Sequence, residues 1–357
     1  MAPISRTEVI KSLHNQTFTI RGLRSAFANW PFKVNPYLDQ ARQDVALMLT
    51  SRFPHHPKLR KLLGGDYGLF GATWWPCAGY RQLLVATYLS LWLFMWDDEL
   101  DSDVGSLANH FDMAQEYRAE TLAFVRNRLG LDDSKITMIS SNEVISSFDF
   151  IGDSLRESCT YEQRQTFVEE FCFFMEKSET EQRLRLGEYL VTIDEFSRYR
   201  LGTSAVRVVL AINQFCHSTD LPSYVTKDAD FVALWDLVNV NICNVNDLLS
   251  VKKEIAQGGA ESLVPILYAK YGSVQKAVDH IVAGIRHTIT ELDATAKRLR
   301  IRYSTDLDVL KGLEIFIDGC KYYCTGNLTW SLSTGRYGVH QESEPDNVII
   351  VLGGSDD

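Results

Sequence analysis

The chain has 357 residues, of which 45% are hydrophobic and 11% aromatic, which is enough apolar material for a large core and excludes a disordered protein. Its formal net charge of -10 argues against nucleic acid or an anionic membrane surface as the main partner, so an anionic substrate would need local cations or metal ions. The seven cysteines are scattered and form no CxxC pair, which is typical of reduced thiols in the cytosol.

The N-terminal part is predicted to be a segment interrupted by turns. Its first residues, MAPISRTEVIKSLHNQ, lack the apolar run of a signal peptide, so we expect a cytoplasmic protein. Prolines recur up to Pro57 and predict that residues 1–36 wrap around the rest of the chain, with one helix following from Tyr37 to Arg52. Glycines at positions 64, 65, 68 and 71 predict a loop ahead of Trp74.

A long stretch without proline follows, from Pro76 to Pro222. Because proline interrupts helices and the apolar residues recur at helical spacing, we predict several long helices here and beyond. Their ranges are 77–96, 104–129, 141–151, 161–186, 193–218, 228–256, 262–271, 273–300 and 305–332. The apolar run from Leu83 to Trp96 is too short to span a bilayer, so we expect no membrane span.

Strand alternation is scarce, which favours an all-α fold. No repeat or linker marks a boundary, and we predict one domain over residues 1–340. The run from Val348 to Val351 falls in an acidic tail, residues 341–357, that we expect to be loosely ordered.

An acidic cluster ends the apolar segment RQLLVATYLSLWLFMWDDELDSD at residues 81–103. If this segment is helical, Asp97 and Asp101 stand one turn apart on the same face. Two such carboxylates form half of a site for a hard cation such as Mg²⁺, which takes oxygen ligands. An acidic surface turn that caps a core helix explains the pattern equally well, so a second set of oxygen ligands is required.

That second set occurs in the segment VNVNICNVNDLLSVKKE at residues 238–254. Asn246, Ser250 and Glu254 are spaced i, i+4, i+8, so a continuous helix aligns an amide oxygen, a hydroxyl and a carboxylate over two turns. Polar residues at this spacing are usually a solvated face, but apolar residues crowd around these three. The spacing therefore predicts a divalent metal site, and Lys253 adds a cation for a phosphate.

These segments resemble the motifs of class I terpene synthases. Residues 97–101, DDELD, look like the aspartate-rich motif of that family, and residues 246–254, NDLLSVKKE, match its NDxxSxxKE triad motif. Arg200 stands where the family has its diphosphate-sensing arginine, and WSLSTGRY at residues 330–337 resembles the closing motif with its Arg-Tyr pair. The WDDELD context is most similar to fungal sesquiterpene synthases. The resemblance implies one helical bundle with a central active-site cavity.

The resemblance also implies the chemistry. The substrate would be a linear isoprenyl diphosphate, foremost farnesyl diphosphate, used with three Mg²⁺ ions for which Mn²⁺ is an expected substitute. The implied metal ligands are Asp97, assisted by Asp101, for two ions and Asn246, Ser250 and Glu254 for the third. The implied diphosphate ligands are Arg200, Lys253, Arg336 and Tyr337.

Departure of the diphosphate would leave an allylic carbocation. Aromatic rings are expected to stabilise this cation without offering it a nucleophile. Phe94 and Trp330 occupy positions where similar proteins line the pocket. Core packing is the favoured interpretation for the other candidates, Tyr88, Trp92, Trp96, Phe148 and Phe174. No histidine lies in the motifs, and His110 and His217 are interpreted as ordinary helix-end residues. Three candidates for the general base remain: diphosphate, water and a backbone carbonyl at a helix break near residues 202–205. At this break, Thr203 and Ser204 depart from the usual pattern of the family.

Several alternatives remain at this point. A diterpene synthase would use geranylgeranyl diphosphate instead. A chain-elongating isoprenyl diphosphate synthase should carry a second aspartate-rich motif, and a protonation-initiated cyclase would need a DxDD motif; the sequence has neither. A catalytically silent helical binding protein would keep the metal ligands as relics. Both a monomer and a homodimer are compatible with the sequence.

Overall fold

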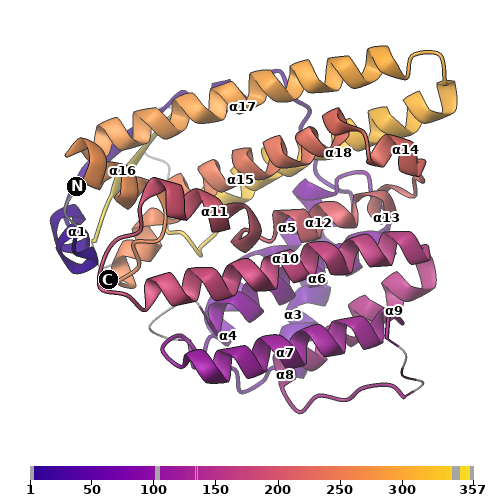
Figure 1. The fold of residues 1–357 in the computed structure, drawn as a ribbon, viewed down its shortest axis with the longest axis horizontal. Coiled ribbons are helices and arrows are strands. Elements are labelled where there is room, and N and C mark those ends of the chain that lie inside the picture. Colours follow the sequence, from indigo (N-terminus) through magenta and orange to yellow (C-terminus); the bar gives the residue numbers. More distant parts are fainter. Residues whose placement is uncertain (1–3, 101–104, 133, 135, 340–345, 354–357) are drawn as a thin grey trace. The chain divides into compact units, whose positions relative to one another are not determined.

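The computed structural model describes residues 4–100, 105–132, 134, 136–339 and 346–353 (Figure 1). Asp101, one of the predicted metal ligands, lies outside these residues. The chain divides into two compact units, which are described separately. The first comprises Met1–Phe32, Arg183–Leu201 and Leu221–Asp357, and the second comprises Lys33–Gln182 and Gly202–Asp220. One domain over residues 1–340 stays a prediction.

The second unit is helical throughout its described elements. They are α3 (Leu38–Arg52), α4 (Leu59–Gly64), α5 (Tyr67–Trp74), α6 (Tyr80–Asp98), α7 (Phe111–Arg128), α8 (Glu143–Ser146), α9 (Asp149–Ser158), most of α10 (Tyr161–Arg185), α12 (Val206–Ala211) and α13 (Asn213–His217). The apolar helix α6 packs against α3, α5, α8, α9, α12 and α13. Because neighbours surround it, nearly all of its side chains between Leu83 and Trp96 are buried, as an uncharged segment requires.

Aromatic side chains fill the centre of this unit. The rings of Trp92 and Phe148 lie 4.9 Å apart, and the ring of Trp96 lies 5.1 Å from that of Phe174. Both indoles also donate hydrogen bonds inside the core, Trp92 to the carbonyl of Val144 (2.8 Å) and Trp96 to the hydroxyl of Thr121 (3.0 Å). These contacts agree with the core-packing interpretation of the four rings.

The loop predicted from the glycines at positions 64–71 is wrong, because α4 and α5 occupy most of that segment. Gly68 and Gly71 serve close packing instead of a turn. A Cβ atom on Gly68 would lie 2.6 Å from Cγ of Arg42 in α3, and one on Gly71 would lie 1.9 Å from Oγ1 of Thr87 in α6. Without these glycines α5 could not approach its two neighbours so closely.

Gly71→Ala is therefore expected to lower the free energy of unfolding by about 2 kcal/mol, because the added methyl group overlaps the buried Thr87. Urea unfolding followed by circular dichroism measures this. Gly64→Ala is the matched control, since nothing lies within 4 Å of its added Cβ, and it should be neutral or slightly stabilising. Equal stability of the Gly71→Ala variant and the wild type would contradict the packing argument.

The first unit is built around α15. Its elements are α1 (Arg6–Leu13), β1 (Thr17–Arg21), α2 (Leu23–Ala26), α11 (Ile193–Thr203) up to Leu201, α14 (Ser223–Thr226), α15 (Ala229–Ala256), α16 (Leu263–Tyr271), α17 (Val274–Arg302), α18 (Leu307–Ser333) and β2 (Asn347–Val351). Helix α15 packs against α16, α17 and α18, and its apolar residues are buried accordingly. Figure 1 shows the long helices α15, α17 and α18 running side by side.

Two short strands complete this unit, which corrects the prediction for part of the tail. Strands β1 and β2 pair antiparallel, with Thr17 opposite Val351 and Arg21 opposite Asn347. Alternate residues of both strands are buried, Phe18 and Ile20 in β1 and Val348 and Ile350 in β2. Residues 347–351 are thus an ordered strand, because an apolar face far away in the sequence gives them a partner. The α-helical class is otherwise confirmed.

Most helix boundaries agree with the predictions, and the exceptions are helix breaks and one helix that begins later than predicted. The predicted helix 193–218 is three helices, because Ala205 has a left-handed backbone (φ 55°) between α11 and α12. This is the break that the resemblance implied near residues 202–205. The predicted helix 141–151 divides into α8 and the start of α9, and the helix predicted from residue 104 begins at Phe111. Within the described ranges no helix is long and apolar enough to cross a membrane.

The two histidines interpreted as helix-end residues do lie at helix ends. His110 precedes α7 and His217 ends α13. Burial lowers the pKa of His217 to about 4, and its Nε2 atom is buried without a hydrogen-bond partner in the described part of the chain. His217 is therefore neutral in the folded protein at neutral pH.

This burial predicts a loss of stability in mild acid. Below pH 6.5 the unfolded chain protonates His217, whereas the folded protein does so only near pH 4, so stability falls as the pH decreases between these values. From about pH 7.5 to about pH 5 the wild type should lose about 2 kcal/mol more unfolding free energy than His217→Gln. Urea titrations of both proteins at the two pH values measure the difference, and parallel losses would refute it.

Candidate active site

The triad motif lies on one ridge of α15. Ser250 Oγ is 2.8 Å from the carbonyl oxygen of Asn246 and 2.5 Å from Oε1 of Glu254, so its hydroxyl joins the other two residues. The second carboxylate oxygen of Glu254, Oε2, is buried and has no hydrogen-bond partner among the described residues. A buried carboxylate oxygen of this kind is costly unless a cation satisfies it. Three hard oxygen donors with one unsatisfied anionic atom fit a divalent metal ion.

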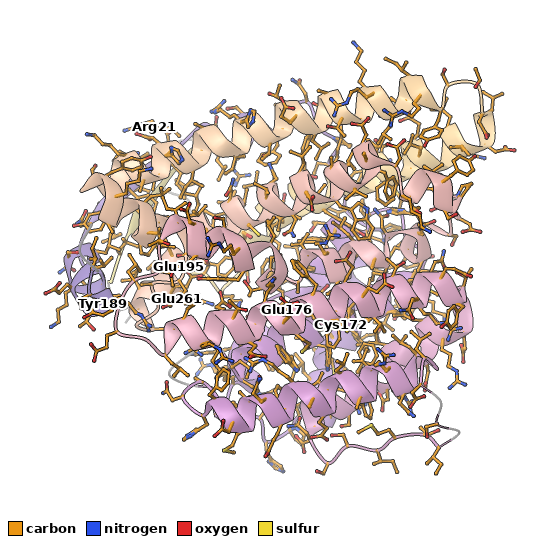
Figure 2. The ribbon with its side chains drawn as sticks, in the orientation of Figure 1. Arg21, Cys172, Glu176, Tyr189, Glu195 and Glu261 are labelled. Atoms are coloured by element: carbon orange, nitrogen blue, oxygen red, sulfur yellow. The ribbon has the colours of Figure 1, made fainter. Side chains whose placement is uncertain are left out.

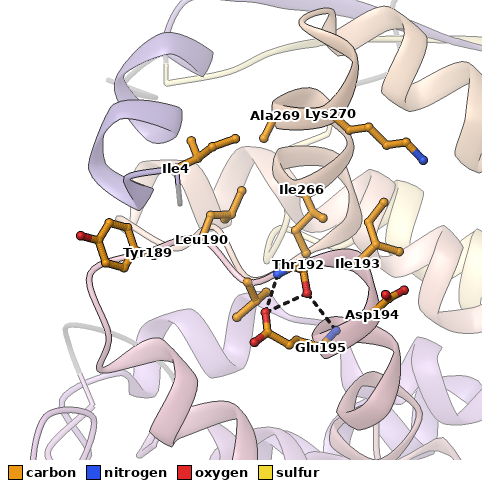
Figure 3. A pocket seen from close by; sticks show the side chains of 11 residues that line it. Ile4, Tyr189, Leu190, Thr192, Ile193, Asp194, Glu195, Ile266, Ala269 and Lys270 are labelled. Atoms are coloured by element: carbon orange, nitrogen blue, oxygen red, sulfur yellow. Dashed lines mark hydrogen bonds between the residues drawn. The ribbon is translucent and has the colours of Figure 1, made fainter. Parts of the chain in front are cut away.

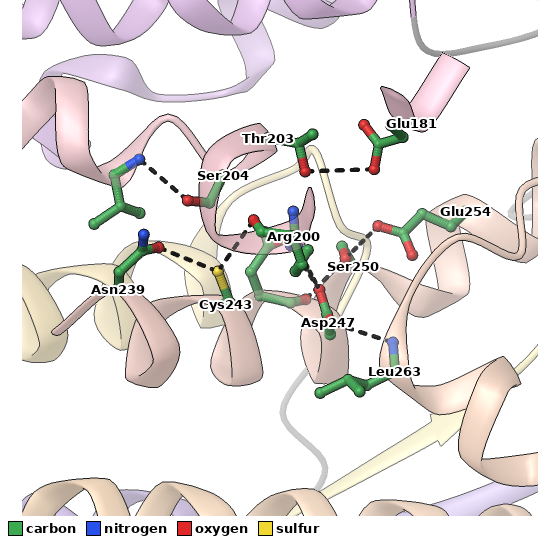
Figure 4. Close-up of polar contacts among 12 residues, drawn as sticks. Glu181, Arg200, Thr203, Ser204, Asn239, Cys243, Asp247, Ser250, Glu254 and Leu263 are labelled. Atoms are coloured by element: carbon green, nitrogen blue, oxygen red, sulfur yellow. Dashed lines mark hydrogen bonds and ion pairs between the residues drawn. The ribbon is translucent and has the colours of Figure 1, made fainter. Parts of the chain in front are cut away.

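Arg200 reaches this ridge from α11 (Figure 4). Its Nε and Nη2 atoms donate to Oδ1 of Asp247 at 3.1 and 2.6 Å, and Nη2 also donates to Oδ1 of Asn246 at 2.9 Å. The arginine that the resemblance assigns to diphosphate thus contacts the amide oxygen that the triad motif assigns to metal. The structure places both predicted residues in one polar cluster.

Asp247 is the centre of this cluster and was not predicted. Its side chain is fully buried, and its Oδ2 atom accepts a hydrogen bond from the backbone nitrogen of Leu263 (3.1 Å) at the start of α16. Burial raises the pKa of Asp247 to about 6, although the positive charge of Arg200 acts in the opposite direction. The helical spacing of Asn246 could not reveal this, because it does not show which side of α15 meets α11.

The α15 helix also fixes the end of α11. Nδ2 of Asn239 donates to the carbonyl of Leu201 (2.7 Å), and the Cys243 thiol lies 4.0 Å from the carbonyl of Arg200. These side chains occupy carbonyls close to the point where Ala205 interrupts the helix. They hold the backbone that carries Arg200 against α15. Asn239 and Cys243 precede Asp247 by two turns and one turn, so spacing alone could have suggested them once one contact was known.

The two unusual residues at the break have local roles in the second unit. The hydroxyl of Thr203 contacts Oε1 of Glu181 at 3.4 Å, and Oγ of Ser204 accepts a hydrogen bond from the backbone nitrogen of Val206 at 3.3 Å. Ser204 thus satisfies one of the unpaired amides at the start of α12. A serine at this position supports the break.

The closing motif meets the triad at Tyr337. The Tyr337 hydroxyl accepts a hydrogen bond from Nδ2 of Asn246 (2.7 Å), its ring lies 5.5 Å from that of Trp330, and Nζ of Lys253 lies 6.0 Å from the ring centre. Trp330 is buried in the last turns of α18. Arg336 follows, with its backbone nitrogen donating to the hydroxyl of Thr334 (3.2 Å). Within one unit, the structure therefore groups residues from the triad, sensor and closing motifs.

The first residues of the aspartate-rich motif lie in the second unit. Asp97 lies in the last turn of α6 and is partly exposed, and Phe94 precedes it by almost one turn. The Phe94 ring lies 5.4 Å from that of Tyr67 and 5.8 Å from that of Phe70. In the part of the chain that the structure describes, no three His, Cys, Asp or Glu side chains group as metal ligands.

A separate cavity of about 560 Å³ lies in the first unit (Figure 3). It is lined by Ile4, the segment 189–195, Ile266, Ala269 and Lys270, and includes none of the predicted site residues. Glu195 Oε2 accepts hydrogen bonds from the backbone and hydroxyl of Thr192, both 2.8 Å, at the start of α11. Tyr189 and Glu195 mark this region in Figure 2, which also shows Cys172, one of seven free cysteines. The hydrogen bonds between Glu195 and Thr192 stabilise the start of α11.

Comparison with known protein families gives a consistent picture. The model of "Terpene synthase family 2, C-terminal metal binding" matches residues 88–291. The chain is 34% identical over 339 residues to the sesquiterpene cyclase hepA of Aspergillus oryzae, covering 92% of this chain and 90% of that protein. It is 32% identical over 336 residues to the sesquiterpene synthase PILCRDRAFT_825684 of Piloderma croceum, with 90% and 91% covered.

Solved structures share the fold at low sequence identity. The α-eudesmol synthase structure superimposes with a TM-score of 0.74 at 16% identity and covers 86% of this chain and 98% of its own. A single-residue variant of cucumene synthase gives a TM-score of 0.71 at 19% identity, with 87% and 99% covered. These two likenesses concern the fold.

Proposed function

This chain belongs to the class I terpene synthases, and we propose that it ionises farnesyl diphosphate with Mg²⁺ and cyclises the resulting cation to a sesquiterpene. The observation that carries the proposal is the ridge of Asn246, Ser250 and Glu254, with the buried, unsatisfied Oε2 of Glu254. The relatives named sesquiterpene cyclase and sesquiterpene synthase support the fifteen-carbon substrate.

The ligand set divides between two motifs. Asn246, Ser250 and Glu254 would hold one of three Mg²⁺ ions, and Asp97, assisted by Asp101, would hold two. When bound, these ions act as Lewis acids on the departing diphosphate. Mn²⁺ is expected to substitute, because it takes similar oxygen ligands.

Charged and hydroxyl donors would bind the diphosphate itself. Arg200 and Arg336 are able to grip two oxygens at once, and Lys253 contributes a point charge. The hydroxyl of Tyr337 is already oriented by Asn246 (2.7 Å) and has a proton of its own to donate. The hydrogen bonds from these donors become stronger as negative charge accumulates on the diphosphate, so they favour its departure.

The hydrocarbon chain requires apolar walls after ionisation. The rings of Phe94 and Trp330 are the proposed faces for the cation, since a ring face attracts positive charge and forms no bond with it. Trp330 is held by Tyr337 through an edge-to-face contact at 5.5 Å, which fixes its orientation. We further propose a cytoplasmic enzyme that works as a monomer or homodimer, without a nucleic-acid or membrane partner.

The test is an incubation of the purified protein with farnesyl diphosphate and, separately, geranylgeranyl diphosphate, with Mg²⁺ or with EDTA. Volatile products are extracted and free diphosphate is assayed. The proposal expects a Mg²⁺-dependent fifteen-carbon hydrocarbon or alcohol from farnesyl diphosphate. A twenty-carbon product alone would assign a diterpene synthase, and no diphosphate release from either substrate would leave a silent helical binding protein.

A further inference from the structure

We propose that Lys58 is a positioning residue for the aspartate-rich motif: its ammonium group holds the end of α6 and thereby orients the carboxylate of Asp97 toward the metal ions. Lys58 belongs to none of the sequence motifs and precedes Asp98 by 40 residues. The inference rests on the proposed function, because it concerns two of the metal ions that this function requires.

The last turn of α6 needs hydrogen-bond donors from outside the helix. Helix α6 ends at Asp98, and the final carbonyl groups of a helix lack partners within it. Nζ of Lys58 donates a hydrogen bond to the carbonyl oxygen of Asp98 at 3.0 Å. A cation at this end of a helix is also attracted by the partial negative charge of the helix dipole. Lys58 thus stabilises the turn that carries Asp97.

The backbone at the end of α6 is also held by a second segment. The backbone nitrogen of Leu107 donates to the carbonyl of Glu99 at 3.0 Å. A Cβ atom on Gly105 would lie 2.5 Å from the carbonyl oxygen of Glu99 and 2.8 Å from that of Asp98, so only glycine allows this close approach. The carbonyl groups of Asp98 and Glu99 are therefore both fixed by contacts with residues outside α6.

The backbone of Lys58 is itself fixed in a short turn. Its nitrogen donates to Nδ1 of His56 at 3.2 Å, and its carbonyl accepts a hydrogen bond from the backbone nitrogen of Leu62 at 3.0 Å, in the first turn of α4. Pro57 restricts the backbone directly before it. The ammonium group therefore reaches α6 from a rigid base, as a residue that supports a functional site should.

The ammonium group binds a backbone oxygen that is not a proposed metal ligand, so it can stay in place when metal ions bind. A positive charge near a metal site would by itself repel the ions and weaken their binding. A group that orients a metal ligand strengthens binding instead, and its loss typically costs about 10–100-fold in affinity. The two effects of Lys58 have opposite signs, so an experiment can separate them.

The test measures Mn²⁺ binding in the presence of inorganic diphosphate and without isoprenyl substrate, from the electron paramagnetic resonance signal of free Mn²⁺. Lys58→Met keeps an apolar stem and removes the ammonium group. We expect this variant to bind Mn²⁺ about tenfold more weakly than the wild type. Lys58→Arg should lose less affinity than Lys58→Met, because it retains a charged donor.

Two controls make the result specific. Lys61→Met removes the same charge from an exposed position of α4, and it should leave Mn²⁺ affinity unchanged or raise it slightly. Lys58→Met in the Asp97→Ala background should cause no further loss, because the carboxylate that Lys58 orients is already absent.

Three further measurements separate positioning from a general loss of stability. Hydrogen exchange of the metal-free Lys58→Met protein should become faster in the peptide that contains the end of α6. With farnesyl diphosphate, the Mg²⁺ concentration for the half-maximal rate should rise about tenfold, while the rate at saturating Mg²⁺ falls by less than that. The melting temperature checks folding, and Lys58→Gln, which is too short to reach the carbonyl, is the second variant if Lys58→Met unfolds.

Unchanged or tighter Mn²⁺ binding by the folded Lys58→Met variant would overturn the proposal, because removal of a charge alone predicts that result. So would a loss that persists in full in the Asp97→Ala background or that Lys61→Met reproduces. The proposed function fails differently: if Lys58→Met shows the expected loss but the wild type releases no diphosphate from farnesyl diphosphate, the role of Lys58 stands and the substrate is wrong.

Discussion

Asn246→Ala is expected to slow Mg²⁺-dependent diphosphate release by at least about a thousandfold. The change removes the amide oxygen from the triad and leaves Ser250 and Glu254 as the remaining proposed ligands on that ridge. A metal ion stabilises departing negative charge by several kcal/mol, and a thousandfold in rate corresponds to about 4 kcal/mol. The same change frees the Tyr337 hydroxyl from its contact with Nδ2 of Asn246, which loosens a proposed diphosphate donor as well.

Single-turnover assays of diphosphate release at saturating farnesyl diphosphate measure this loss. Asn244→Ala is the matched control, because Asn244 lies on the same helix two residues earlier and is not part of the triad motif. It should keep the wild-type rate within a few-fold. If Asn246→Ala kept more than about a tenth of the wild-type rate, the amide oxygen would not be a metal ligand on which the reaction depends.

Asp247→Ala is expected to lower the free energy of unfolding by about 3 kcal/mol or more. The change removes a fully buried carboxylate from its ion pair and leaves the guanidinium of Arg200, whose side chain is only 16% exposed, without the anion it contacts. The backbone nitrogen of Leu263 loses its acceptor at the same time. Urea unfolding of the metal-free protein measures the effect.

Two comparisons test the cause of that loss. Asp230→Ala removes a carboxylate that pairs with the exposed arginines Arg298 and Arg302, and surface pairs of this kind contribute little to stability. The double change Arg200→Met with Asp247→Asn should cost less than Asp247→Ala, because no buried charge is left behind. If Asp247→Ala and Asp230→Ala were equally stable, the buried pair would not be the cause.

Local rules predicted the long helices well and the contacts between elements poorly. The helices α3 and α10 begin and end within one residue of the predicted bounds, since proline and helical apolar spacing act locally. Gly68 and Gly71 favour a loop in the sequence, because glycine is common both in turns and where two elements pack closely. Only their neighbours in the structure, Arg42 and Thr87, show that close packing is the reason here. Strand β2 was missed because its partner, β1, lies at the other end of the chain.

The candidate site shows the same division. Asn246, Ser250 and Glu254 could be predicted from spacing, because a continuous helix aligns them whatever it packs against. The place of Arg200 came from the resemblance alone, and its contacts with Asp247 and Asn246 depend on how α11 crosses α15. Asp247 reads in the sequence as one more acidic residue of a motif. Its burial, which raises its pKa, is a property of the tertiary structure.

The pairing of the first strand with the last has a practical consequence for engineering. Thr17 lies opposite Val351 and Arg21 opposite Asn347, so segments near the two ends of the chain are neighbours in one small sheet. A linker joining these ends, with new ends opened in the exposed turn at residues 304–306 between α17 and α18, would give a circular permutant with the same helix packing. In such a protein a reporter could be attached beside α18, far in sequence from the paired strands.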